Sequence, residues 1–149
     1  MKNKVTILLC LILTVGLISS CKKDDDDKPR KDLLTGSTCW KITKYEERDD
    51  KGNFVDFTND TYDACELDDC TRFGTDGNYV NTDSGVKCDP DNSILEEGTW
   101  SLIDGDKKIV MTPTGLGFSV TFTIESITAN TLVVTTSFIG PELRITYKN

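Results

Sequence analysis

Apolar and polar residues alternate along the last third of the chain, a pattern typical of strands with one buried face and one wet face. The first such strand places its apolar side chains at every second position: Phe118, Val120, Phe122 and Ile124. The spacing recurs in two further runs: Leu132, Val134, Thr136 and Phe138, then Leu143, Ile145 and Tyr147. Asn130 and the pair Gly140-Pro141 mark the turns, so a three-stranded meander is predicted here.

Shorter strands are expected upstream, at about 38–45, 53–57, 70–74, 77–82, 96–103 and 107–112. Turn signals separate several of them: Lys51-Gly52-Asn53, Asp76-Gly77-Asn78 and Asp104-Gly105-Asp106. A short helix is expected around residues 59–67, with Asn59 or Asp60 as its cap. Eight or nine short strands in roughly 115 residues suit either an up-and-down barrel or a two-sheet sandwich, and periodicity alone does not decide between them.

Residues 1–20 have the layout of a secretion signal. Lys2 and Lys4 precede an apolar run from Val5 to Ile18, which is shorter than the roughly 20 residues of a membrane-spanning helix. The sequence Ile18-Ser19-Ser20-Cys21 then resembles a bacterial lipobox. This resemblance implies cleavage before Cys21 and acylation of its thiol, so the mature chain is expected to be held at a membrane by lipid.

Residues 21–32 are expected to be the lipidated cysteine and a flexible tether, because residues 22–32 mix acidic and basic side chains and contain no apolar one. An acidic cluster directly after a lipidated cysteine also resembles the signals that send lipoproteins to the surface of some Gram-negative bacteria. That resemblance implies an outer-membrane location with exposure at the cell surface. The alternative is a solvated spacer. The rest of the chain, residues 33–149, is expected to be one domain.

The charge balance excludes several classes of function. The chain holds 25 acidic and 17 basic side chains, which gives a net charge of −8. Such a surface repels a phosphate backbone, so no nucleic-acid partner is expected. The chain contains no histidine, which removes imidazole acid/base catalysis, the Ser-His-Asp arrangement and imidazole metal sites. Neither an enzymatic activity nor a cofactor is expected.

Several short motifs of the body follow one another in an informative order. They are Trp40, Ala64-Cys65-Glu66-Leu67-Asp68-Asp69, Phe73, Asp76-Gly77-Asn78-Tyr79, Lys87-Cys88-Asp89, Gly98-Thr99-Trp100 and the closing meander. Together they resemble the lipocalin-like domains of bacterial, Gram-negative cell-envelope lipoproteins, over about residues 33–149. The resemblance implies an all-β fold, an antiparallel up-and-down barrel of about eight strands, with a β-sandwich as the alternative. Lipocalins carry Gly-x-Trp in the first strand, whereas here it occurs at Gly98 to Trp100 and Gly36 lies four residues before Trp40.

Four cysteines remain in the body: Cys39, Cys65, Cys70 and Cys88. An even number in a small secreted domain predicts two disulfides, with three possible connectivities. A metal site of four thiolates is the alternative, but the spacing contains no Cys-x-x-Cys pair and the compartment is oxidising. The lipocalin-like resemblance implies that Cys65 pairs with Cys88, which leaves Cys39 with Cys70.

Acidic residues gather in several predicted turns. Asp89, Asp91 and Ser93, with Glu96 or Glu97, partly match a calcium loop, yet no glycine stands at the turn position. Solvated turns are therefore the preferred interpretation, and no metal site is predicted. Paired carboxylates of a glycosidase are also disfavoured, because these acids lie in turns of a domain without an evident large cleft.

Five aromatic residues are candidates for lining a cavity: Trp40, Trp100, Phe118, Phe122 and Phe138. A small barrel needs such side chains simply to fill its interior, and it can also hold one small molecule.

Taken together with the resemblances above, the sequence favours a lipid-anchored, non-enzymatic lipoprotein of the outer membrane that binds a small apolar ligand. The alternative is a protein-interaction or inhibitory module that acts through loops such as 47–53 and 83–96, with an unidentified protein partner.

Overall fold

The computed structural model describes residues 28–88, 90–137 and 140–149 of the chain. These described residues form two helices, α1 (Arg30–Gly36) and α2 (Thr58–Thr61). The strands are β1 (Lys41–Arg48), β2 (Phe54–Asp56), β3 (Cys70–Phe73), β4 (Asn78–Thr82), β5 (Ile94–Ile103), β6 (Lys108–Pro113), β7 (Val120–Ile127), β8 (Thr131–Thr136) and β9 (Leu143–Lys148). Each predicted strand is present, although β1 begins at Lys41 rather than near residue 38.

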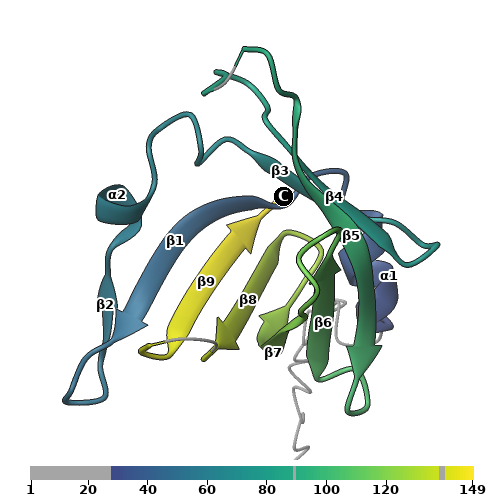
Figure 1. The fold of residues 1–149 in the computed structure, drawn as a ribbon. Helices are drawn as coiled ribbons and strands as arrows, with labels where there is room; N and C mark the ends of the chain where they lie inside the picture. Colours follow the sequence, from purple (N-terminus) through teal and green to yellow (C-terminus); the bar gives the residue numbers. More distant parts are fainter. Residues whose placement is uncertain (1–27, 89, 138–139) are drawn as a thin grey trace, which may run out of the picture.

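All nine strands belong to one antiparallel sheet in the order β2-β1-β9-β8-β7-β6-β5-β4-β3. The strands from β3 to β9 form a meander, and β1 lies beside the last of them. Figure 1 shows how strongly this sheet curves around its interior. The predicted all-β antiparallel fold is confirmed, with nine strands where about eight were expected.

The sheet is not closed by a continuous ladder within the described residues. Its two edges are β2 and β3, and an isolated antiparallel bridge links Trp40, just before β1, to Thr71 of β3. The Cys39–Cys70 disulfide lies directly beside this bridge, with the two Cα atoms 5.1 Å apart. The sequence did not decide between a closed barrel and a sandwich. The structure is one curved sheet, and within the described part of the chain its first and third strands are linked only at the Trp40–Thr71 bridge and the adjacent disulfide.

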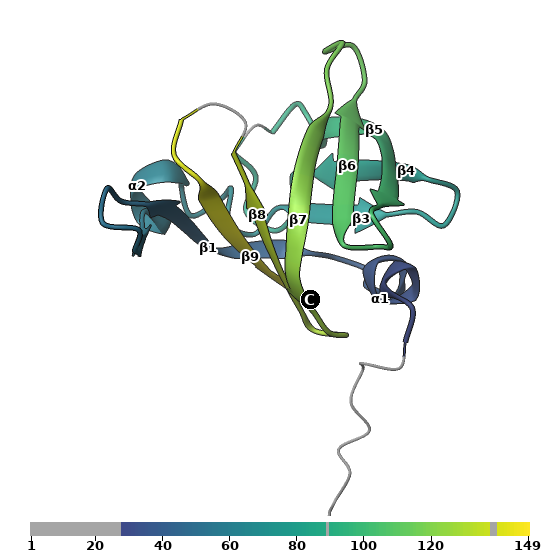
Figure 2. The ribbon, with the colours of Figure 1, turned by 90° about the horizontal axis from the view of Figure 1, so that it is seen from below.

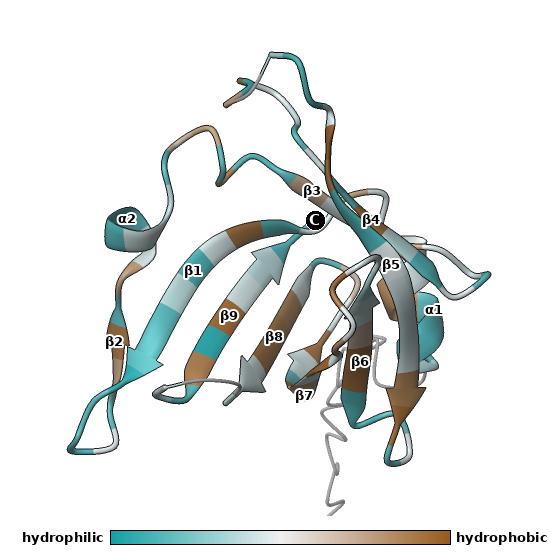
Figure 3. Ribbon diagram, in the orientation of Figure 1, coloured by the Kyte–Doolittle hydropathy of each residue, from teal (hydrophilic) through white to brown (hydrophobic). Residues whose placement is uncertain are grey.

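The alternation predicted for the meander is confirmed along β7 and β9 (Figure 3). In β7 the side chain of Ile124 is buried, whereas Thr121, Thr123 and Glu125 are exposed. Phe118 departs from the prediction, because it precedes β7 and is 42% exposed. Gly115 and Gly117 adopt positive φ angles of 83° and 71°, so the chain before Val120 turns instead of continuing the strand.

The short helix α2 differs from its prediction in position. It begins at Thr58 rather than at residue 59 or 60, and it ends at Thr61 rather than near residue 67. The carboxylate of Asp56 accepts hydrogen bonds from the backbone N–H of Thr58 (2.9 Å) and from its hydroxyl (2.6 Å), which fixes the start. Beyond the helix, Tyr62 packs edge-on against Tyr45 of β1, with ring centroids 5.7 Å apart.

Helix α1 was missed by the sequence analysis, which assigned Arg30 to Asp32 to the tether. Pro29 stands at its N-cap position, where the missing N–H of proline costs nothing. Leu33 and Leu34 of this helix are buried, and their burial against the sheet orders the segment. In Figure 2 the helix lies at the end of the barrel opposite the turn between β6 and β7. We call the α1 end the closed end and the opposite one the open end.

No helix in the described part of the chain is long and apolar enough to cross a membrane. The proposed signal of residues 1–20, Cys21 and the residues that follow it up to Asp27 lie outside the described residues, as do Asp89 and Phe138.

Candidate ligand cavity

A cavity of about 210 Å3 lies inside the curved sheet. Side chains from eight of the strands surround it: Ile42, Thr71, Phe73, Tyr79, Asn81, Glu96, Ile109, Met111, Pro113, Val120, Phe122, Leu132, Val134 and Tyr147. Most of these are apolar, as is typical of sites that take small molecules. We call this space the cavity.

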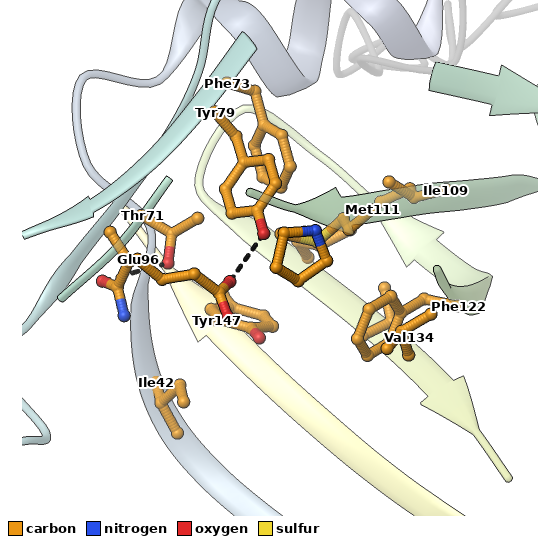
Figure 4. Close-up of a pocket in the computed structure, with 14 residues that line it drawn as sticks. Ile42, Thr71, Phe73, Tyr79, Glu96, Ile109, Met111, Phe122, Val134 and Tyr147 are labelled. Carbon is orange, nitrogen blue, oxygen red and sulfur yellow. Dashed lines mark hydrogen bonds between the residues drawn. The ribbon is translucent and has the colours of Figure 1, made fainter. Parts of the chain in front are cut away.

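One wall of the cavity is apolar. Met111 of β6, Phe122 of β7 and Val134 of β8 face the interior from neighbouring strands (Figure 4). They do so because each occupies an inward position of the alternating pattern, next to the buried residues Ile109 and Leu132. This wall can pack against hydrocarbon and offers it no hydrogen-bond partner.

The opposite side of the cavity carries polar groups. The hydroxyl of Tyr79, a residue that is 3% exposed, donates a hydrogen bond of 2.7 Å to Oε1 of Glu96. Tyr147 lies nearby in Figure 4. The hydroxyl of Thr71 and the side-chain oxygen of Asn81 lie 3.5 Å apart on the same side. The interior is therefore amphipathic rather than uniformly apolar.

Both tyrosine hydroxyls of the cavity are held in the protonated form. Burial raises the pKa of Tyr79 well above its ordinary value, and the hydrogen bond to the Glu96 carboxylate raises it further. Burial likewise raises the pKa of Tyr147, with smaller contributions from Tyr62 and from the negative charge of Glu96. These hydroxyls therefore remain neutral hydrogen-bonding groups at any physiological pH.

The structure separates the five aromatic candidates for the cavity. Phe122 lines it, whereas Trp40 and Trp100 are 1% and 6% exposed in the packed core and do not border it. Phe118 lies outside the cavity, at the exposed position described above, and Phe138 lies outside the described residues. Tyr79, Glu96 and Tyr147 were not predicted as cavity residues. Gly98, the partner of Tyr79 across the sheet, leaves room for the ring, but this pairing follows from the register of β4 and β5 and not from a local sequence signal.

The open end of the barrel carries exposed apolar side chains next to the cavity. A shallow groove, here called the rim groove, is lined by Ile94, Leu95, Glu96, Glu97, Pro113, Thr114 and Leu116. It shares Glu96 and Pro113 with the cavity. Ile94 and Leu116 are 51% and 55% exposed, and Val86 in the preceding loop is 70% exposed. A ligand that enters past Glu96 would cross this apolar rim.

The two predicted disulfides are confirmed, Cys39 with Cys70 and Cys65 with Cys88. Cys65 follows α2 and Cys88 lies in the loop between β4 and β5, so their bond ties together two segments without regular structure. Among the described residues no group of three or more histidine, cysteine or acidic side chains is placed to hold a metal ion. Asp89 of the calcium alternative lies outside those residues, and Asp91 is exposed.

Comparison with known proteins identifies the class. A family model described as a lipocalin-like domain matches residues 34–134. The chain therefore belongs to the lipocalin-like domain family.

Two solved structures are similar to the chain at 14% sequence identity. One is a lipocalin-like protein from Bacteroides uniformis, with a TM-score of 0.49, 78% of this chain covered and 98% of the other. The second is a DUF4847 family protein from Bacteroides vulgatus, with a TM-score of 0.51 and coverages of 78% and 95%. At this identity the second likeness supports the fold alone. No protein with a curated function matches the chain.

Proposed function

We propose that this domain binds a small apolar molecule in the cavity, without catalysing a reaction. The observation that carries the proposal is the cavity itself, about 210 Å3 of space inside a packed sheet, bordered by Met111, Phe122 and Val134. A domain that served only as a rigid support would have no need of such a space, because side chains normally fill the interior of a small β-sheet domain.

The size of the cavity restricts the ligand. Sites for drug-sized molecules span roughly 300–1,000 Å3, so a space of about 210 Å3 suits a smaller molecule or a single short alkyl chain. The rim groove adjoins the cavity at Glu96 and Pro113, so a longer ligand could extend into it.

We further propose that the protein acts at the cell envelope of a Gram-negative bacterium, as a lipoprotein of the outer membrane with lipid on Cys21. The lipobox-like sequence Ile18-Ser19-Ser20-Cys21 and the secretion-signal layout before it support this anchor. The acidic cluster after Cys21 supports exposure at the cell surface. The two disulfides agree with an oxidising compartment outside the cytosol.

A second candidate function is favoured by the exposed apolar residues of the open end. Val86, Ile94 and Leu95 belong to the 83–96 segment expected to serve an interaction module, and all three are exposed. Exposed apolar side chains grouped in this way are typical of surfaces that meet another molecule. In this alternative the protein partner would contact the rim, and the cavity would play no part.

A binding experiment separates the two candidates. A protein of residues 28–149 contains every helix and strand described here, and it can be titrated with the uncharged fluorophore N-phenyl-1-naphthylamine. We expect fluorescence enhancement with the wild type and its loss in Val120→Trp, which fills the cavity from β7. The matched control is Thr121→Trp, which places the same ring on the outer face of the same strand.

Stability measurements on Phe122 complete this test. Because Phe122 borders a space that already exists, Phe122→Ala should cost less than the roughly 3–5 kcal/mol typical of a tightly packed aromatic. Ile124→Ala, in the buried core of the same strand, should cost about 2–5 kcal/mol. The interaction module would be favoured instead if the wild type binds no fluorophore and if Phe122→Ala lowers the free energy of unfolding in urea by the full 3–5 kcal/mol, roughly the cost of truncating a tightly packed aromatic.

A further inference from the structure

The polar side of the cavity, as the described residues form it, offers a charged hydrogen-bond acceptor but no charged donor. Its one ionisable acid is Glu96, whose carboxylate accepts the hydroxyl proton of Tyr79 at 2.7 Å. A carboxylate offers about four lone-pair sites, and Tyr79 uses one of them. Glu96 is exposed, at the point where the cavity meets the rim groove. Acceptor capacity therefore remains where the polar end of a ligand would lie.

The cavity has no positive charge to balance this carboxylate. Of the fourteen lining residues, all within the described part of the chain, none is a lysine or an arginine. The net charge of −8 adds a negative field of longer range. A ligand carboxylate placed here would stand beside Glu96 with like charge and with no cationic partner.

We propose that the cavity selects amphiphiles whose polar head donates hydrogen bonds, an ammonium or a hydroxyl group, and that it discriminates against carboxylates. This proposal rests on the proposed function, since it assigns the head group of the molecule that enters the cavity. The apolar body of the ligand packs against Met111, Phe122 and Val134, and the head lies between Glu96 and Tyr147 (Figure 4).

Each polar residue has a separate role in this arrangement. Tyr79 holds the Glu96 carboxylate by a hydrogen bond, which reduces the number of orientations that the exposed side chain can adopt. Glu96 accepts hydrogen bonds from the ligand head, and these are stronger when the donor is charged. The Tyr147 hydroxyl stays protonated for the reasons given above and is available as a neutral partner.

Three probes of equal chain length test the head-group preference: octylamine, octan-1-ol and octanoate, competing with N-phenyl-1-naphthylamine at pH 7. We expect octylamine to bind about tenfold more tightly than octanoate, a difference that matches one charged hydrogen bond reduced by solvent screening. Octan-1-ol should lie between them. Raising the salt concentration should narrow the gap, because the charge of Glu96 is partly in water.

Two variants assign the preference to one side chain. Glu96→Gln should bring octylamine and octanoate within about twofold of each other, since the carboxylate is the source of the discrimination. Glu125→Gln is the matched control, because it removes the same charge from an exposed residue of β7 that lines neither the cavity nor the rim groove, and it should keep the preference. Thermal unfolding verifies that both variants are folded.

The outcomes distinguish this proposal from the function on which it rests. If octanoate binds as tightly as octylamine, or if Glu125→Gln abolishes the preference as fully as Glu96→Gln, head-group selection by Glu96 is wrong while apolar binding stands. If the fluorophore does not bind to the wild type, both proposals are overturned. If it binds but none of the three probes displaces it, head-group selection is wrong while apolar binding stands.

Discussion

The indole Nε1 of Trp40 donates a hydrogen bond of 3.0 Å to the carbonyl oxygen of Leu34. The two residues are 1% and 0% exposed, so the bond is shielded from water. Leu34 belongs to α1 and Trp40 directly precedes β1, which means that this contact fastens the helix to the closed end of the barrel. Trp100 makes the equivalent bond to the carbonyl oxygen of Gly74, also at 3.0 Å. Both tryptophans are therefore structural parts of the closed end.

Trp40→Phe should lower the free energy of unfolding by about 2–3 kcal/mol, because it leaves the buried Leu34 carbonyl without its donor and creates a small void. Urea unfolding gives the magnitude. Amide hydrogen exchange should also accelerate in residues 30–36. Trp100→Phe is the control: it removes the indole bond to Gly74 at the same end and leaves the Trp40–Leu34 bond intact, so the amides of α1 should exchange no faster than the lower global stability of this variant requires. Unchanged exchange in α1 of the Trp40→Phe protein would contradict the role given to this bond.

Gly98→Ala should damage the cavity as well as the fold. A Cβ at this position would collide with the carbonyl oxygen of Thr112 and would lie 2.8 Å from the ring of Tyr79. We expect a loss of about 2 kcal/mol or more, from the strain of overpacking, and a weaker Tyr79–Glu96 contact. Gly36→Ala is the matched control, since nothing lies within 4 Å of its Cβ, and it should cost less than about 0.5 kcal/mol. Equal stabilities of the two variants would refute the steric argument.

The pair Glu46–Arg144 predicts an acid-dependent part of the stability. Glu46 is 3% exposed and accepts two hydrogen bonds of 2.8 Å from the Arg144 guanidinium, which lower the pKa of the carboxyl below its ordinary value. The ordinary pKa of a glutamate carboxyl, about 4.5, applies to the unfolded chain. Because the folded pKa is lower, the stabilisation is fully present above about pH 4.5 and is lost as the pH falls through the folded pKa. Glu46→Gln should therefore cost about 1–2 kcal/mol at pH 7.

Urea unfolding from pH 7 to pH 3 checks this expectation. The difference in the free energy of unfolding between the wild type and Glu46→Gln should shrink in the acid range. A difference that stays constant over the whole range would mean that the charge of Glu46 is not the cause.

The Cys65–Cys88 disulfide should stabilise the segments around the open end. Its sequence separation is 23 residues, for which the chain-entropy model gives about 3 kcal/mol. The double variant Cys65→Ser/Cys88→Ser should lose about this amount, and the loop at residues 83–93 should become sensitive to proteases. Thiol titration of the denatured 28–149 protein should find no free group in the wild type. Two or more free thiols would contradict the pairing.

Cys21→Ser tests the lipid anchor. In a Gram-negative host the wild type should fractionate with membranes, and intact-mass spectrometry should find acyl chains on its N-terminal cysteine. The variant should remain uncleaved or become soluble. Cys10→Ser, within the proposed signal, should behave as the wild type does, because that cysteine leaves with the signal. An unmodified Cys21 in the mature wild type would refute the anchor.

The strands could be predicted from the sequence because their signals are local. Alternation sets the faces of β7 and β9, and the Asp104-Gly105-Asp106 turn adopts the positive φ angles, 56°, 63° and 63°, that such a sequence favours. Helix α1 could not be predicted in this way, since its order comes from burying Leu34 against strands that are distant in sequence.

The cavity could be predicted only in part, because alternation gives the face of a strand but not the height along the barrel. Trp40, Trp100 and Phe122 all have interior side chains, yet only Phe122 lies at the level of the cavity. In the sequence, Glu96 stands out only as one oxygen ligand of the disfavoured calcium loop. Its contact with Tyr79 depends on the register between β4 and β5, which the sequence does not state.

The disulfide between Cys39 and Cys70 determines how the domain responds to a mechanical pull on the chain that precedes α1. Without it, such a force would reach β1 and peel it from β9 one hydrogen bond at a time. With the bond in place, the load at Cys39 is shared between β1 and β3, and among the described residues those that precede the disulfide, 28–38, are the ones that can extend while the sheet stays intact. A domain tethered from its N-terminal side could thus lose α1 under tension while its sheet, and the cavity within it, keep their shape.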